Sequence, residues 1–407
     1  MKKILMMSTI LVGAVAFTGN AFADGGAAAK PVAKKASAKK AAKGTKAPAE
    51  TAAAPKAGSG LTVTVGGFMD FQAGFADQDS VFKTGAFSRD VKFANDTEVH
   101  IKVSGVADSG LKYGAVIELN ADVSADADAD GGNADKTYLF IESSAGRLEA
   151  GANSPVTTSM QVSAASIARA TGGVDGDFYR FANLGAAFIT TQALPAREAA
   201  TGGTREDANK LSYYSPVFSG LQLGASYTPD EGDSGTSAAS TGKLNGNNEN
   251  VFDVGLTYKN QFNGGVGVKA SAIGEFGNAE LAGTQDTNAW GVGLELDYKG
   301  FALAGSYTDW QDSGLVTGAT DDNQHSWTVG ASYETGPFGV SVTYLDSTGS
   351  NGTTDQDFQN VSLGADYKLA PGLVPYVEVS FFDTDDNVAG TPDNSGSVVL
   401  IGTQLNF

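Results

Sequence analysis

The chain has 407 residues, 53 glycines, no cysteine and a formal net charge of −19. The lack of cysteine excludes disulfide scaffolds, thiolate metal sites and cysteine nucleophiles. Ten Lys and two acids give residues 1–60 a net charge of +8, whereas 17 basic and 44 acidic residues give residues 61–407 a net charge of −27. Since the main body is acidic and has almost no basic clusters, we expect no nucleic-acid partner.

Residues 1–23 have the pattern of a secretory signal peptide. Lys2 and Lys3 precede an apolar run at 4–17, and the small residues around Ala23 fit a cleavage site. The apolar run is shorter than the about 20 residues that a membrane-spanning helix needs. We therefore expect cleavage after Ala23 and export of the chain.

Residues 24–60 consist almost entirely of Ala, Lys, Pro, Gly, Ser and Thr, with eight lysines. A segment of this composition cannot bury enough apolar surface to fold. We predict a disordered periplasmic arm. It acts either as a flexible linker or as a polycation that touches an anionic partner, such as peptidoglycan or lipid headgroups.

From residue 61 onward, apolar residues alternate with small or polar ones, which predicts strands with two unlike faces. Residues 292–298 show the pattern: Val, Leu, Leu and Tyr alternate with Gly, Glu and Asp. Sixteen such segments are joined by seven short turns and eight longer acidic connections. An even strand number with both ends on the short-turn side predicts an all-β fold, a transmembrane antiparallel barrel of 16 strands. The alternative, a soluble sandwich, needs larger inward side chains than the Gly, Ser and Thr found here.

Aromatic residues stand at both ends of the predicted strands. Tyrosines close four strands just before short turns, at 258, 298, 333 and 367, and Phe252, Trp290 and Trp327 open three of these strands at even offsets. Even spacing places both aromatics on the lipid face, one at each membrane boundary. Trp310 falls out of phase, which indicates a bulge or a different strand boundary there.

The sixteen-strand layout and the order of several short motifs resemble the trimeric general porins of Gram-negative bacteria. The resemblance rests on the opening strand 63–71, the hairpin 98–113, the stretch 210–220 and the terminal Phe407, and it covers about 61–407. It implies a homotrimer in the outer membrane, surrounded by lipid and lipopolysaccharide, with the long third loop folded into the lumen as a constriction. It also implies that the barrel assembly machinery reads Phe407. The lysine-rich arm departs from the simplest members of the family.

The connection at 154–207 is far longer than a hairpin needs, and such loops are usually functional or disordered. By position it matches the constriction loop of the family, and a short helix is expected within 159–170. The candidate constriction residues are Arg169, Asp175, Asp177, Arg180, Arg197 and Arg205. Similarity places Asp175 and Asp177 near the inner tip of the loop, opposite basic residues of the wall. Strand alternation gives the candidate pore wall as His100, Lys102, Lys112, Glu118 and Arg147.

Opposed charges across a narrow water channel create a transverse field that favours polar and ionic solutes. The net charge of the body favours cations, whereas the arginines of the long loop can reverse this at the narrowest point. We expect passive diffusion of small hydrophilic solutes and ions, with a weak preference for cations. Two alternatives stay open: a channel selective for anions such as phosphate or organic acids, and a structural barrel tethered to peptidoglycan through the arm.

The acidic loop at 122–135 has oxygen ligands at alternate positions followed by Gly131, like the start of a calcium loop. It lacks the closing Glu of an EF-hand, so it is either a hydrated loop or a looser structural Ca²⁺ site that bridges lipopolysaccharide phosphates. The candidate ligands are Asp126, Asp128, Asp130 and Asp135. No other cofactor and no enzyme activity are expected. His325 and Ser326 are neighbours on a strand and point to opposite faces, which excludes a hydrolase pair.

Overall fold

The computed structural model describes residues 60–122, 134–184, 208–235, 248–319, 324–350, 352–385, 387, 390 and 392–407. The expected signal peptide and all but the last residue of the arm lie outside the described residues. So do Asp126, Asp128, Asp130, Arg197 and Arg205. Among the residues that the structure describes, no helix is long and apolar enough to cross a membrane.

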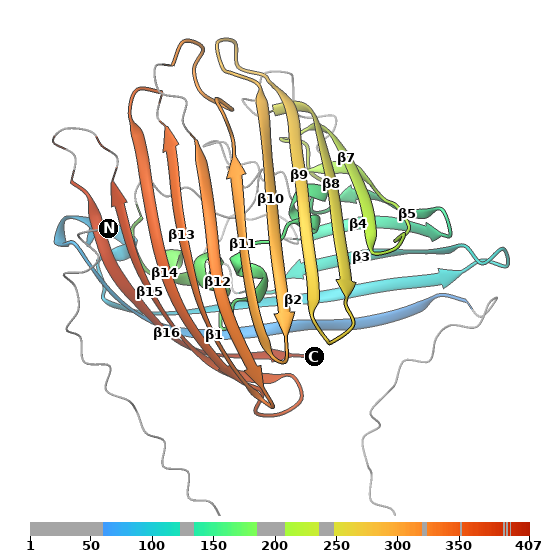
Figure 1. Cartoon of the computed structure of the whole chain (residues 1–407), viewed down its shortest axis with the longest axis horizontal. Helices are drawn as coiled ribbons and strands as arrows, with labels where there is room; N and C mark the ends of the chain where they lie inside the picture. Colours follow the sequence, from blue (N-terminus) through green and yellow to red (C-terminus); the bar gives the residue numbers. More distant parts are fainter. Residues whose placement is uncertain are drawn as a thin grey trace, which may run out of the picture. The chain divides into compact units, whose positions relative to one another are not determined.

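Within the described residues, sixteen antiparallel strands form one closed barrel, as expected (Figure 1). Each strand pairs with its neighbours in the sequence, and β1 pairs with β16 to close the ring. The strands are β1 (Thr62–Gln78), β2 (Val91–Val106), β3 (Lys112–Asn120), β4 (Ala134–Ser143), β5 (Gly146–Ala152), β6 (Asn209–Tyr214), β7 (Leu221–Asp230), β8 (Asn248–Gln261), β9 (Gly267–Ala279), β10 (Thr287–Tyr298), β11 (Phe301–Asp309), β12 (His325–Thr335), β13 (Phe338–Ser350), β14 (Asp355–Tyr367), β15 (Leu373–Asp385) and β16 (Asn394–Asn406).

The seven expected short turns all join paired strands. The tightest, between β10 and β11, consists of Lys299 and Gly300, with φ angles of 48° and 86°. Two positive φ angles are what a two-residue hairpin needs to match the twist of its strands. The first long connection carries two 3-10 turns, η2 (Ser80–Phe82) and η3 (Gly85–Phe87). The start of β1 and the end of β16 meet at the short-turn end of the barrel, where Gly67 and Phe407 exchange two backbone hydrogen bonds of 3.0 Å.

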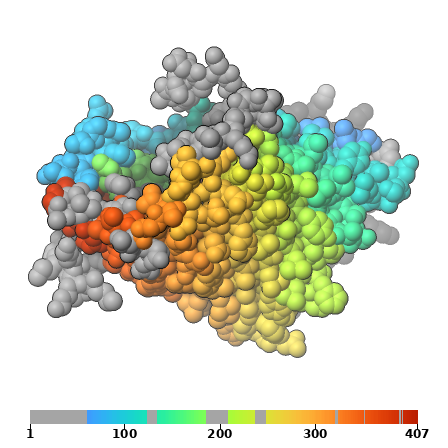
Figure 2. Space-filling model, turned by 90° about the horizontal axis from the view of Figure 1, so that it is seen from above, coloured from blue at the N-terminus to red at the C-terminus, as the bar shows by residue number. Residues whose placement is uncertain are grey.

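The outer face of the barrel is apolar. On β10, Val292, Leu294, Leu296 and Tyr298 are each 40–47% exposed, and Figure 2 shows the neighbouring strands in yellow and orange side by side on this surface. A soluble protein rarely exposes so continuous an apolar surface. In a barrel with polar residues inside, this face contacts lipid.

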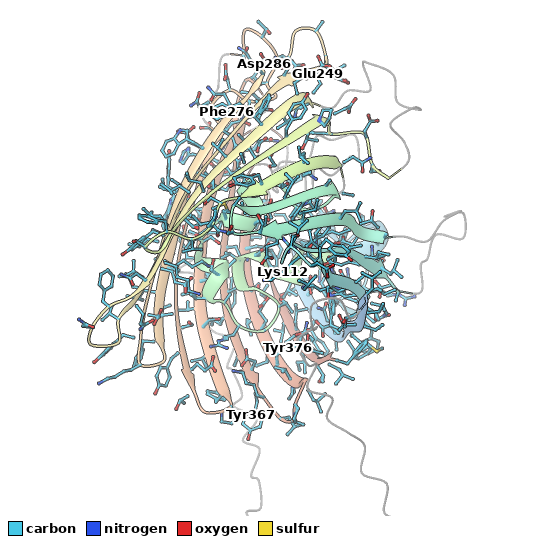
Figure 3. The ribbon with its side chains drawn as sticks, turned by 90° about the vertical axis from the view of Figure 1, so that its right-hand side faces the viewer. Lys112, Glu249, Phe276, Asp286, Tyr367 and Tyr376 are labelled. Atoms are coloured by element: carbon cyan, nitrogen blue, oxygen red, sulfur yellow. The ribbon has the colours of Figure 1, made fainter. Side chains whose placement is uncertain are left out.

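The two aromatic girdles lie where the pattern predicts. In Figure 3, Tyr367 lies at one end of the barrel and Phe276 at the other. The rings pair across strands, as in Trp290 and Tyr307, whose centroids are 5.6 Å apart. Trp310 is the exception: β11 ends one residue before it, and its ring is 3% exposed, packed with Met160 inside the barrel. Its odd phase therefore marks a strand boundary.

Candidate functional site: the inner loop and the lumen wall

The described part of the long connection after β5, residues 153–184, lies inside the barrel and is called the inner loop below. It consists of short turns, drawn in green within the barrel in Figure 1. These are α1 (Val156–Met160), η4 (Ala164–Ile167), η5 (Gly173–Asp175) and η6 (Asp177–Arg180). The expected helix over 159–170 is broken, because Gln161 adopts an extended conformation with ψ 148° and Ser163 begins a new capped turn.

Backbone N–H groups of the inner loop bind side chains of the lumen wall. A loop without regular structure must find partners for its buried N–H groups elsewhere. The N–H groups of Val156, Val162, Ala164, Arg169, Val174 and Asn183 donate to Ser226, Ser271, Thr328, Ser341, Thr343 and Gln78, in that order, over 2.9–3.1 Å. These partners lie on β7, β9, β12, β13 and β1, so the loop follows a long arc of the wall.

Glycines of the wall let the inner loop approach the strands closely. A Cβ atom on Gly293 would lie 1.9 Å from the carbonyl oxygen of Val162, and one on Gly224 or Gly255 would meet the Met160 sulfur at 2.5 or 2.8 Å. The sequence pattern predicts that the Gly, Ser and Thr residues of the polar face line a water-filled lumen. Along this arc of the wall, residues of these types instead contact the inner loop.

Glu378 of β15 anchors the inner loop through three hydrogen bonds. Its side chain is completely buried. It accepts hydrogen bonds from the Thr171 hydroxyl at 2.7 Å and from the N–H groups of Thr171 and Gly173 at 3.2 Å. Beside it, Phe178 of the loop stacks on Phe358 of β14, with ring centroids 6.4 Å apart. Three hydrogen bonds to one buried carboxyl group, next to an apolar contact, hold this part of the loop on the wall.

The arginines of the inner loop pair with acids of the wall. Arg180 contacts Asp96 of β2 at 2.8 Å and Asp177 at 3.2 Å. Arg169 contacts Glu334 of β12 and lies 3.8 Å from Asp366 of β14. Each described arginine of the loop therefore has two carboxylate partners, and Glu334 also pairs with Lys368.

Asp177 does not take the partner expected for it. It was expected to face Lys102, Lys112 or Arg147, but it accepts a hydrogen bond from Gln72 of β1 and lies beside Arg180. Arg180 is three residues away on the same turn, so it reaches the carboxylate at little entropic cost. Burial raises the pKa of the Asp177 carboxyl above its usual value, although Arg180 and Gln72 act in the opposite direction. Asp175, the other expected tip residue, ends η5 on the same stretch of loop.

Two of the candidate wall residues share one acid. Lys112 contacts Glu142 of β4 at 2.8 Å, and Arg147 contacts Glu142 at 3.4 Å and Glu149 at 2.6 Å. Arg147 lines a cavity of about 490 Å³ beside the base of the inner loop. Its other lining residues include Lys136, Tyr138, Glu142, Glu149, Ser159 and Tyr214. Basic and acidic side chains thus alternate across the part of the lumen wall that β3, β4 and β5 form.

His100 and Glu118 come together on β2 and β3 and are joined by Glu98, which the sequence did not single out. The register places His100 directly opposite Glu118, and His100 Nε2 lies 2.7 Å from a Glu98 oxygen. Lys102 lies two residues further along the same face of β2.

Asp135, the one described candidate calcium ligand, pairs with Lys136 at 2.9 Å.

Sequence reasoning missed the wall residues that hold the loop, above all Glu378, Glu334, Asp96 and Gln72. The alternation pattern predicts that these residues lie on the polar face of their strands. It does not predict their binding partners, because alternation gives the face of a residue but not the segment that covers it.

The comparisons with known proteins agree with this architecture. Residues 11–387 match the sequence model of the family described as Gram-negative porin. This chain is a Gram-negative porin. Its place is therefore the outer membrane, and its fold belongs to a family of channels rather than enzymes.

This porin resembles proteins of Rickettsia in sequence and solved porins in fold. An uncharacterized protein of Rickettsia conorii is 26% identical over 68% of this chain and 76% of its own length. An uncharacterized protein of Rickettsia typhi is 26% identical over 86% of this chain and 93% of its own length. Among solved structures, the anion-selective porin from Comamonas acidovorans shares 16% identity, with a TM-score of 0.57 over 86% of this porin and 100% of that chain. A mutant of Rh. blastica porin shares 16% identity, with a TM-score of 0.52 over 85% of this porin and 100% of that chain.

Proposed function

We propose that this porin is a water-filled channel for passive diffusion of small hydrophilic solutes and ions, with a weak preference for cations. The observation that carries the preference is that Arg169 and Arg180 each pair with two carboxylates, of which Asp177 lies on the inner loop and the other three on the wall. Neither arginine adds an uncompensated positive charge at the inner loop. Residues 61–407 hold 17 basic and 44 acidic residues, a net charge of −27. This negative charge then dominates the electrostatic potential that a permeating ion meets. The alternation of charges near β4 and β5 keeps the preference weak.

The reversal potential under a KCl gradient in a planar bilayer tests this proposal. We expect a potential on the cation side, small and further reduced by salt, because screening shortens the reach of the acidic charges. Conductance in steps of three would support the expected homotrimer. A potential on the anion side would contradict the cation preference and make Arg197 and Arg205 the candidates for attracting anions. Anion selectivity is named for the Comamonas porin, which makes a selective anion channel the second candidate.

The lysine-rich arm supports a separate proposal, that residues 24–60 tether the barrel to peptidoglycan. Eight lysines in an unpatterned segment can bind an anionic polymer through charge alone. We expect deletion of 24–60 to abolish sedimentation of the porin with purified cell wall and to leave conductance unchanged. Substituting the eight lysines by glutamine at constant length is the matched control for charge. Unchanged sedimentation in both variants would leave the arm as a linker only.

Three further expectations complete the proposed setting of the porin. We expect lipid and lipopolysaccharide to surround the outer apolar face, the assembly machinery to recognise Phe407, and Ca²⁺ to bind the acidic segment 122–135. The aromatic side chain of Phe407 is 61% exposed, which leaves it accessible for recognition.

A further inference from the structure

Three side chains with metal-binding atoms converge on the lumen wall next to the inner loop. The potential ligand atoms of Glu98, His100 and Glu118 all lie within 4.8 Å of one another. Two come from β2 at alternate positions, and the third lies directly across on β3. Alternate residues of one strand and the facing residue of its neighbour share one face of a sheet, which holds three ligands on a rigid base.

The composition of the cluster selects the class of metal. One imidazole nitrogen and two carboxylate oxygens suit a borderline dication such as Zn²⁺, whereas Ca²⁺ and Mg²⁺ prefer oxygen ligands alone. Zinc binds nitrogen at about 2.0–2.1 Å and carboxylate oxygen at about 2.0–2.2 Å. Small side-chain rotations therefore suffice to enclose an ion. The ion would replace the contact of 2.7 Å between His100 Nε2 and Glu98.

The surroundings hold the cluster in place and leave it accessible. The His100 ring meets Phe68 edge to face, with centroids 6.2 Å apart. Its side chain is 39% exposed, and that of Glu98 is 19% exposed. Lys136 contacts one Glu118 oxygen at 3.3 Å. Since a carboxylate has two oxygens, Glu118 can keep this lysine and still offer a ligand atom.

We propose that Glu98, His100 and Glu118 form a binding site for Zn²⁺ or a similar transition-metal dication in the conduction path. Asp96, which holds Arg180 of the inner loop, lies two residues before Glu98 on the same face of β2. The ion would therefore sit beside the loop. The two glutamates give the three ligands a formal charge of −2, which a dication neutralises. A bound ion then removes the negative charge by which this part of the free wall attracts cations.

Isothermal titration of the purified full chain, without an affinity tag, with ZnCl₂ in detergent micelles tests the site. We expect His100→Gln to remove the tightest Zn²⁺ site and Glu118→Gln to weaken it at least about tenfold, because even indirect metal contacts change affinity by about 10–100-fold. The matched control is His325→Gln, since His325 is the other histidine of the chain and stacks against Tyr307 at 6.0 Å. Circular dichroism confirms that each variant keeps its β-sheet.

The results separate cleanly. Equal isotherms for wild type and His100→Gln, or loss of the site in His325→Gln, would overturn the metal site. Calcium chloride in place of zinc chloride should give no His100-dependent binding. The effect on conduction rests on the proposed channel function, whereas the calorimetry does not. We expect Zn²⁺ to lower the K⁺ conductance of wild type but not of His100→Gln. Unchanged conductance in a protein that binds the ion would place the site outside the conduction path.

Discussion

Replacing Glu378 with leucine is expected to release the inner loop from the wall and to raise the single-channel conductance. The substitution leaves the N–H groups of Thr171 and Gly173 without their acceptor. Gly173 is buried and Thr171 half-buried, and a buried N–H group without a partner costs about 1–3 kcal/mol, so the docked loop loses at least about 1–3 kcal/mol. Since about 1.4 kcal/mol is a factor of ten, the ratio of docked to undocked loop falls about fivefold or more. Planar-bilayer recording measures the conductance and its fluctuations.

Two variants control this result. Glu378→Gln keeps a carbonyl acceptor of the same size, so we expect a smaller effect. The second control is Ser380→Ala. Ser380 lies two residues further along the same face of β15, but its hydroxyl contacts Ser362 at 2.6 Å rather than the loop. We expect its conductance to equal that of wild type. If Glu378→Leu also conducts like wild type, Glu378 does not hold the loop in the membrane-embedded channel.

Gly293→Val is expected to displace the other part of the inner loop by steric conflict. The added Cβ would lie 1.9 Å from the carbonyl oxygen of Val162, a distance at which the backbone must move. We expect conductance to rise and larger sugars to enter liposomes faster, as a swelling assay measures. Gly291→Ala on the same face is the control, because its Cβ would lie 3.3 Å from Thr308 and Tyr307 on the neighbouring strand and would not meet the loop.

The double variant shows whether the loop moves as one unit. Residues that act through one two-state element are not additive. If either substitution undocks the whole loop, Glu378→Leu with Gly293→Val should conduct like each single variant. A conductance well above both would show that the two parts of the loop leave the wall independently.

The barrel was predictable because its rules are local. Alternation fixes the face of each residue, and the turns fix where strands end, so His100, Lys102 and Arg147 could be placed on the wall from the sequence. Loop contacts were not predictable. Arg169 and Glu334 are far apart in the sequence, and nothing local indicates that the loop lies over β12. Trp310 shows the limit at strand ends, where a change of direction breaks the alternation.

The pairing of β1 with β16 also has a consequence for folding. Every other strand pair joins neighbours in the sequence, so hairpins can form locally and early. The pair that closes the ring joins the two strands that are furthest apart, and its loop-closure entropy is the largest. Until these strands meet, the intermediate has two unpaired edges, which are templates for aggregation. We therefore expect that a partner covering both edges speeds folding, and that mutations at the Gly67–Phe407 contact slow closure more than they weaken the finished barrel.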